Sequence, residues 1–299
     1  MTRREFLFLG AALLAAPTLA GAEEWEDPPP GPAPGGLLPL TGGPLHFETG
    51  GYGSRTIVFI HDQFTDASVW DDIWPILGRE YRTVRYDRRG FGATPPASGA
   101  YSPVQDLAAL LDHLRTPSAV LLAGSDGANI ALDFALTYPS MVEQILLVSP
   151  IVSGAPMTPA YQAWLDANNA PLAGGDAAAA AGNWASDRYI VSGPNRSARG
   201  RLRQIYSRCP NDLSNRDAQA IASPPLMTRM SAVQSQTLIL SGARDMPEVI
   251  TLSQSVQRMI PGARRDPVQG AGHLIYLDEP EIFAAAALAF VRTFGATTG

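Results

Sequence analysis

The sequence predicts an α/β fold in which a mostly parallel central sheet is flanked by helices and interrupted by one helical insertion. Three observations indicate this class. Short runs with strand composition alternate with apolar residues at helical spacing from residue 56 onward. The alternation stops between residues 152 and 232 and then resumes. One strand runs through small residues directly into a helix. We therefore expect a core of residues 45–151 and 233–299, with a helical cap at 152–232 inserted between two strands.

The elements of the core follow in a regular order. Strands are predicted at 56–60, 83–86, 119–122, 144–148 and 237–240, and several of these lack polar alternation, as strands buried on both faces do. Helices are predicted at 68–81, 103–114, 129–137, 248–260 and 281–294. Asp278 and Glu281 have the spacing of a capping box at the start of the last helix.

The first 44 residues are expected to lie outside this fold. Residues 1–22 combine Arg3 and Arg4, a short apolar run and a small-residue cleavage site, which is typical of an export signal. The opening Thr2–Leu7 resembles the twin-arginine motif, which implies bacterial export of the folded chain by the twin-arginine machinery, so the protein is expected to be periplasmic or secreted. The apolar run is too short to give a stable membrane anchor. Residues 23–44 are rich in Pro and Gly and are predicted to be a linker.

Composition removes several kinds of chemistry. The 22 basic residues are all arginine, so lysine Schiff bases and Ser–Lys dyads are excluded. Cys209 is the single cysteine, which excludes an internal disulfide and paired-cysteine metal sites. The net charge of −6 argues against nucleic acid as a partner. We expect no cofactor and no metal.

A candidate nucleophile lies where the third predicted strand meets its helix. Ser125 is flanked by Ala123 and Gly127, and this strand–turn–helix context is that of a nucleophile elbow. Asp126 is the rival nucleophile at this turn. With Ser125 as the nucleophile, glycine falls two positions later, whereas Asp126 would place Ala128 there. The register therefore favours Ser125.

A serine nucleophile needs a base and an orienting acid. In enzymes with this elbow the chain order is serine, acid, histidine, and His273 is the one histidine after Ser125. Asp245 ends the loop after the strand at 237–240 and is the best candidate acid. Glu248 is a reserve.

Five segments in order resemble the α/β-hydrolase fold family, in its Ser-His-Asp branch with a helical cap, over residues 44–297. They are Phe59–His61, the turn Tyr86–Gly92, the Ser125 elbow, Gly242–Asp245 and Gly270–His273. The resemblance implies a serine hydrolase that cleaves a small or medium carboxylic ester or lactone through an acyl-enzyme.

The resemblance also places an oxyanion hole at the backbone N–H groups of Gln63 and Asp126. It implies that the cap shapes the substrate pocket, with Asp62, Trp164 and Trp184 as candidate pocket residues. Asp62 departs from the family pattern, which has glycine there. A carboxylate at this place would oppose an oxyanion unless it is paired or points away.

Several alternatives stay open. The same triad serves C–C bond hydrolysis, peptide-bond hydrolysis and perhydrolysis, and Asp62 is compatible with a non-catalytic ligand-binding member of the fold. The segment 196–208 carries five arginines, which are expected to form a solvated helix face or, less favoured, to capture an anionic substrate or surface.

Overall fold

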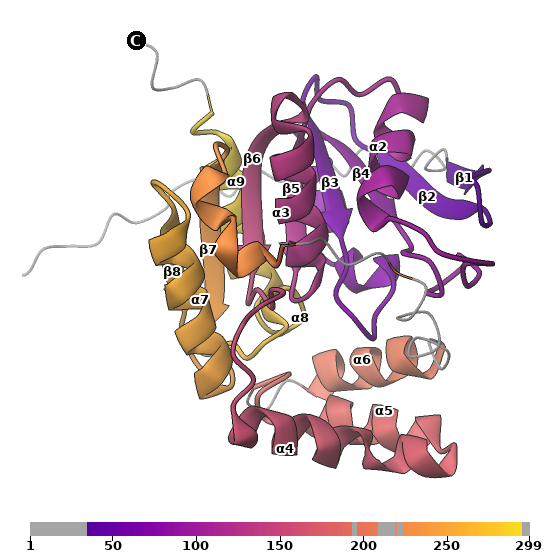
Figure 1. Ribbon diagram of the computed structural model, residues 1–299, viewed down its shortest axis with the longest axis vertical. Coiled ribbons are helices and arrows are strands. Elements are labelled where there is room, and N and C mark those ends of the chain that lie inside the picture. Colours follow the sequence, from indigo (N-terminus) through magenta and orange to yellow (C-terminus); the bar gives the residue numbers. More distant parts are fainter. Residues whose placement is uncertain (1–34, 193–195, 209–218, 220–223, 295–299) are drawn as a thin grey trace, which may run out of the picture. The chain divides into compact units, whose positions relative to one another are not determined.

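An eight-stranded sheet runs through the computed structural model (Figure 1), with the strand order β1-β2-β4-β3-β5-β6-β7-β8. The strands from β4 to β8 in this order pair in parallel, while β1 and β2 join the sheet antiparallel. The strands are β1 (Gly35–Leu38), β2 (Leu45–Gly50), β3 (Thr56–Ile60), β4 (Arg82–Tyr86), β5 (Ala119–Gly124), β6 (Val142–Val148), β7 (Gln236–Gly242) and β8 (Arg264–Val268).

Helices cover both faces of the sheet, and an apolar cluster lies beneath each set. One cluster joins the sheet to α2, α3 and α7, and the other joins it to η1, α1, α8 and α9. Because both faces are covered, every residue of β3 and β5 is buried. The predicted fold class is thereby confirmed. These helices are η1 (Ala67–Trp70), α1 (Trp74–Leu77), α2 (Pro103–His113), α3 (Gly127–Thr137), η2 (Pro139–Met141), α7 (Pro247–Met259), α8 (Ile275–Asp278) and α9 (Pro280–Val291).

The structure describes residues 35–192, 196–208, 219 and 224–294. The predicted export signal, residues 1–22, lies outside them, as do residues 23–34 of the predicted linker. None of the helices in the described ranges is both long and apolar enough to cross a membrane.

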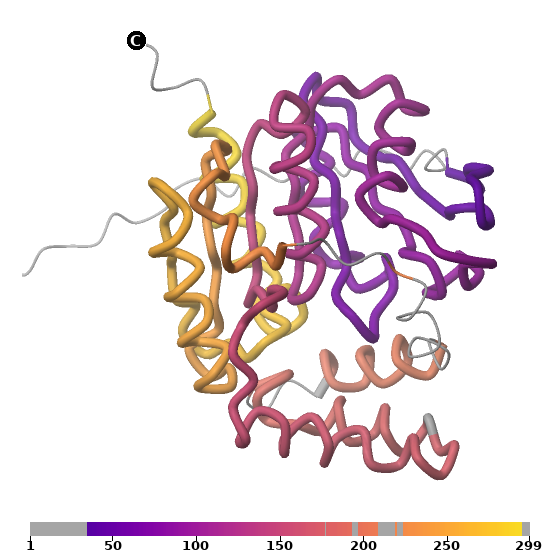
Figure 2. The backbone as a smooth tube through the Cα atoms, in the orientation of Figure 1, coloured from indigo at the N-terminus to yellow at the C-terminus, as the bar shows by residue number. Residues whose placement is uncertain are grey.

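The insertion between β6 and β7 contains α4 (Pro159–Asn169), η3 (Ala170–Gly174), α5 (Ala177–Ser186), α6 (Arg196–Arg208), η5 (Leu226–Thr228) and η6 (Met230–Ala232). In Figure 2 the tube leaves β6 and enters α4, and the helices α4, α5 and α6 lie together. Trp184 and Leu202 belong to the same buried cluster as Trp70 of the core. The insertion therefore packs on the core through shared apolar side chains, and we call it the cap.

Three local expectations differ from the structure. Residues 35–38, placed in the linker by the sequence, form β1, because pairing with β2 stabilises an edge strand whose own pattern is too short to reveal it. The helix expected at 68–81 is divided into η1 and α1. The capping box is wrong: α9 begins at Pro280, and the Asp278 carboxylate instead accepts the N–H groups of Gly272 and Ser192.

Candidate active site

Ser125 sits on a strained turn at the carboxyl end of β5. Its φ is 49°, in the left-handed region that non-glycine residues seldom adopt. Its N–H donates to the carbonyl of Val148 in β6 at 2.8 Å. A Cβ at Gly127 would lie 2.9 Å from the carbonyl oxygen of His61, so only glycine lets α3 start this close to the end of β3. Buried main chain thus holds the serine at the carboxyl end of this central strand.

The structure brings Ser125, His273 and Asp245 into one chain of hydrogen bonds. The Oγ of Ser125 lies 2.8 Å from Nε2 of His273, and Nδ1 of His273 lies 3.0 Å from Oδ2 of Asp245. Because a carboxylate only accepts, Nδ1 carries the proton and Nε2 accepts from the serine hydroxyl. Glu248, the reserve acid, contacts the hydroxyl of Thr158 instead.

Close main-chain packing positions the acid next to the histidine. A Cβ at Gly242, the last residue of β7, would overlap the carbonyl of Gly272, so only glycine lets the main chain of β7 lie this close to the loop after β8. Asp245 is 3% exposed, and its other carboxylate oxygen accepts the N–H of Met246 at 2.7 Å. The acid is therefore locked in one orientation toward His273.

The loop that carries His273 is also bonded to the cap. The N–H of His273 donates to the carbonyl of Tyr189 at 2.7 Å. Asp278 accepts the N–H of Ser192 in the cap at 2.7 Å and that of Gly272 at 2.8 Å. The cap segment 189–192 thus supports the histidine loop through main-chain and carboxylate hydrogen bonds.

Three carboxylates raise the pKa of His273. Burial lowers the pKa of this imidazole, but Asp245, Asp62 and Asp126 raise it, and the net result is a pKa above the ordinary value of 6.5. These carboxylates therefore stabilise the imidazolium that forms when His273 takes a proton from Ser125.

The peptide between Asp62 and Gln63 is oriented by His61. The N–H of Arg88 donates to Nε2 of His61 at 2.9 Å, so Nδ1 carries the proton and donates to the carbonyl of Asp62 at 2.7 Å. In a trans peptide the N–H of Gln63 points opposite to that carbonyl. Burial, with the nearby Arg88, lowers the pKa of His61 to about 4, so it stays neutral. His61 thus shapes the loop 61–66, called the β3 loop below.

The side chain of Asp62 is paired rather than free. Its Oδ2 accepts from the hydroxyls of Tyr276 at 2.6 Å and Thr65 at 2.9 Å, and the residue is 2% exposed. Burial raises the pKa of this carboxyl to about 6. The carboxylate that departs from the family pattern is therefore paired, through two hydroxyl donors to its Oδ2.

Arg88 is a site residue that sequence reasoning did not single out. Its guanidinium donates two bonds of 3.0 Å to the carboxylate of Asp126 and one of 3.2 Å to the carbonyl of His61. It therefore bridges the β3 loop and the serine turn, and it balances the charge next to the Asp126 N–H. Its place in the turn Tyr86–Gly92 was the available signal.

Trp164 and Trp184, predicted to line the pocket, belong to an aromatic group of the cap. Their ring centroids lie 5.0 Å apart, edge to face, and the Trp184 ring also stacks on Phe64 of the β3 loop at 5.1 Å. Trp184 is 4% exposed. This tryptophan therefore packs the cap against the β3 loop.

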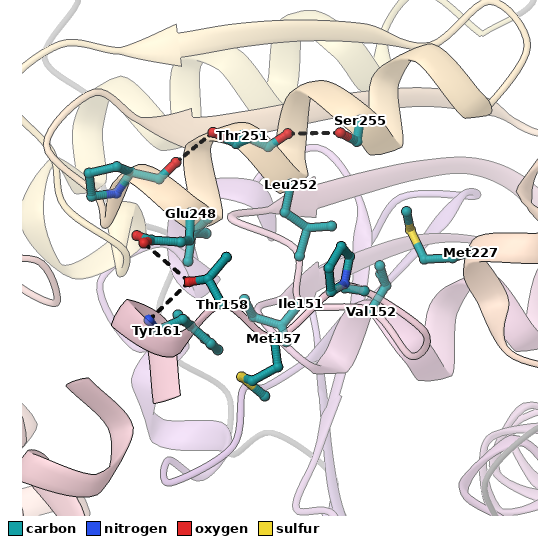
Figure 3. Close-up of a pocket in the computed structure, with 14 residues that line it drawn as sticks. Ile151, Val152, Met157, Thr158, Tyr161, Met227, Glu248, Thr251, Leu252 and Ser255 are labelled. Carbon is teal, nitrogen blue, oxygen red and sulfur yellow. Dashed lines mark hydrogen bonds between the residues drawn. The ribbon is translucent and has the colours of Figure 1, made fainter. Parts of the chain in front are cut away.

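The pocket in Figure 3 reaches Pro247, two residues after Asp245, and holds about 390 Å³. It is formed between the start of the cap and α7, and its lining is mostly apolar, which is usual for small-molecule sites. Asp62, Trp164 and Trp184 are not among its lining residues, nor are Ser125 and His273. Residues that the figure labels include Ile151, Met157, Tyr161, Met227, Glu248 and Leu252. Within the part of the chain that the structure describes, no cluster of His, Cys, Asp or Glu could hold a metal ion.

Two of the five arginines in the segment 196–208 differ from both expectations because they bond the core, whereas Arg203 is exposed, as expected for a solvated helix face. Arg201 pairs with the carboxylate of Asp72 and donates to the carbonyl of Ser68 at 2.6 Å. Arg208 lies 3.3 Å from the carboxylate of Asp66 and donates to the hydroxyl of Ser68. These two side chains of α6 therefore attach the cap to the core segment 66–72.

Comparisons with known proteins agree with this architecture. Residues 57–286 match the model of the alpha/beta hydrolase family. The chain is 24% identical to 3-oxoadipate enol-lactonase 2 of Acinetobacter baylyi, over 84% of this chain and 94% of the relative. A solved hydrolase of Pseudomonas aeruginosa is 26% identical with a TM-score of 0.70, covering 87% of this chain and 99% of its own. The enol-lactonase of Burkholderia xenovorans has a TM-score of 0.72 at 21% identity, covering 86% and 100%. Since the matched model spans most of the sheet and the cap, this chain belongs to the alpha/beta hydrolase family, as its motifs predict.

Proposed function

We propose that this α/β-hydrolase cleaves a carboxylic ester or lactone through an acyl-enzyme on Ser125. The observation that carries the proposal is the unbroken chain from the Ser125 hydroxyl through His273 to Asp245, at 2.8 Å and 3.0 Å. A hydroxyl next to a neutral imidazole that is itself held by a carboxylate is the arrangement that acyl transfer requires.

The steps follow from the positions of the protons. Nε2 of His273 takes the Ser125 proton as Oγ attacks the carbonyl carbon, and the developing oxyanion accepts hydrogen bonds from the N–H groups of Gln63 and Asp126. The imidazolium then protonates the leaving alkoxide, which departs as an alcohol or, in a lactone, stays attached as a hydroxyl. Water, deprotonated by the same imidazole, cleaves the acyl-enzyme and restores the serine.

The relatives support the substrate class. One curated relative and one structural neighbour are enol-lactonases, whose ring esters need the same attack on a carbonyl carbon. The case for a non-catalytic binding protein rested on Asp62, and the hydroxyls of Tyr276 and Thr65 pair that carboxylate. C–C bond hydrolysis, peptide hydrolysis and perhydrolysis would use the same three residues, so the choice among them is a matter for substrate tests.

The first experiment is labelling with a serine-reactive fluorophosphonate. We expect labelling of the wild-type chain and none of Ser125→Ala, with both variants folded by circular dichroism. In parallel, p-nitrophenyl esters of increasing acyl length and simple lactones are compared by kcat/KM, with β-diketones and peptides as the competing substrates. Folded protein that neither labels nor turns over any ester or lactone would falsify the proposal.

We also propose that residues 1–22 direct export of the folded chain through the twin-arginine machinery, to a periplasmic or secreted location. Support comes from the sequence alone: Arg3 and Arg4, the apolar run and the cleavage site. The test is fractionation of bacteria that express the full chain. Export should stop in the double variant Arg3→Lys, Arg4→Lys and in cells without the twin-arginine transporter. Continued export in both cases contradicts the assignment.

A further inference from the structure

A strained residue in the β3 loop makes contacts that the mechanism above does not use. Phe64 directly follows Gln63 and has a φ of 76°, in the left-handed region. A bulky residue in that region is rare and persists only where its surroundings hold it there. The ring of Phe64 must therefore be held by its surroundings.

The ring of Phe64 is held by the cap. It stacks on Trp184 of α5, with centroids 5.1 Å apart and planes at 29°, and lies 5.8 Å from the ring of Tyr206 in α6. Trp184 and Tyr206 are 4% and 8% exposed, so both rings are buried where the cap meets the core. Side chains from two different cap helices thus contact one side chain of the β3 loop.

The other side of Gln63 is anchored to the core. Asp62 accepts from Tyr276 at 2.6 Å, and its carbonyl accepts from His61 at 2.7 Å. Gln63 therefore lies between a neighbour tied to the core and a neighbour tied to the cap. The cap arginines reinforce the second tie, because Arg201 bonds the carbonyl of Ser68 at 2.6 Å a few residues further on.

We propose that Phe64 is a positioning residue through which the cap holds the β3 loop in the conformation that presents the Gln63 N–H to the reaction. The inference rests on the proposed function, since it needs that amide to stabilise an oxyanion. It assigns the cap a share in transition-state stabilisation in addition to shaping the pocket.

The test uses the full chain and the variant Phe64→Gly, which removes the ring and also suits a φ of 76°, so folding should be retained. For a p-nitrophenyl ester we expect kcat to fall about 10- to 100-fold, less than the loss of a whole oxyanion donor, with KM changed less than about threefold. The affinity for a trifluoromethyl ketone should fall by the same factor, because its adduct with Ser125 places an oxyanion at the same donors. Phe64→Tyr keeps the ring and should stay within about threefold of wild type.

Tyr206→Leu examines the same contact from the cap. It should lower kcat in the same direction, and its effect should shrink when Phe64 is already glycine, because the partner ring is gone. A Phe64→Gly variant with wild-type kcat, one in which only KM rises, or full additivity with Tyr206→Leu would each overturn the inference. If wild type turns over esters and Phe64→Gly does so equally well, this inference alone is refuted. If wild type neither turns over esters nor binds the ketone, the proposed function and this inference are overturned together.

Discussion

The turn that carries Ser125 and the loop that carries Gln63 are built in different ways. The serine turn is held by buried main chain: β5 supplies it, β6 accepts its N–H, and Gly127 lets α3 start against β3. The β3 loop is held by side-chain contacts of its own His61, of Tyr276 in the core and of the aromatic rings of the cap.

The serine turn is therefore robust, whereas the β3 loop is adjustable. Main-chain packing in a parallel sheet leaves almost no freedom, so the position of the nucleophile is set by the fold. Side-chain contacts can change one at a time, so the stabilisation of the oxyanion depends on residues that lie in the cap as well as the core. Substitutions in the two regions should therefore separate loss of the nucleophile from loss of transition-state binding.

The largest effect is expected for His273→Ala. Without a base for Ser125, kcat should fall by a factor on the order of 10⁴ to 10⁶, as for triads in general. Folding should be retained, because the N–H of residue 273 can still bond the carbonyl of Tyr189. Ester turnover and thermal denaturation give the two readouts. His113→Ala, an exposed histidine of α2, is the matched control, and turnover by His273→Ala equal to that of the control would break the triad.

Arg88→Gln acts at the point where the β3 loop and the serine turn meet. It removes the bridge between the β3 loop and the serine turn and leaves the Asp126 charge uncompensated beside an oxyanion donor. We expect kcat to fall roughly 10²-fold, comparable to the loss of one such donor.

The double variant Arg88→Gln, Asp126→Asn then serves as its control. It removes the unbalanced charge and should recover part of the lost kcat. No recovery would mean that Arg88 acts through His61 alone.

Asp62 should make the stability of the chain depend on pH. The pKa of this carboxyl is about 6 in the folded chain against 3.8 as the ordinary value. A raised pKa stabilises the fold below pH 3.8, and that stabilisation is lost as pH rises through about 6, by an amount on the order of 2–3 kcal/mol. The free energy of unfolding of Asp62→Asn should therefore rise relative to that of wild type as the pH is raised from 4 to 8. Denaturant titrations at both pH values measure it, with the exposed Asp112→Asn as control. A difference that is constant with pH contradicts the assignment.

The acid limb of the pH–rate profile reports His273 directly. The imidazole must be neutral at Nε2 to accept the serine proton, so kcat/KM should fall as pH drops through a pKa that lies above 6.5. Asp62 is one of the carboxylates that raise it, so Asp62→Asn should move the limb to lower pH. A limb that lies below 6.5, or that does not move, would show that these carboxylates do not act on the base.

The smallest effect is expected where the cap is attached by charge. Arg201 pairs with Asp72, whose side chain is 47% exposed, so the bond is screened by salt. Arg201→Gln should lower kcat two- to threefold at low ionic strength and make it less sensitive to salt than wild type. Arg203→Gln, an exposed arginine of the same helix, carries the same change of charge and should behave as wild type. Equal responses of the two variants would show that the Arg201–Asp72 pair has no effect of its own on kcat.

Much of this molecule was determined by the sequence alone. Buried strands without polar alternation predicted β3 and β5, and the break in alternation predicted the cap, because burial on both faces leaves a pattern in consecutive residues. The scarcity of histidine pointed to His273 before any contact was known. Composition and local pattern were sufficient there because each depends on residues that are near in the chain.

Contacts between side chains that are far apart along the chain became apparent only in the tertiary structure. The pairing of Asp62 with Tyr276 joins residues 214 positions apart, and that of Arg201 with Ser68 joins residues 133 apart. No local pattern encodes such contacts, because they depend on how the sheet places its loops and on where the cap packs. For the same reason the edge strands β1 and β8 escaped prediction: they are stabilised by the strand beside them and have little pattern of their own.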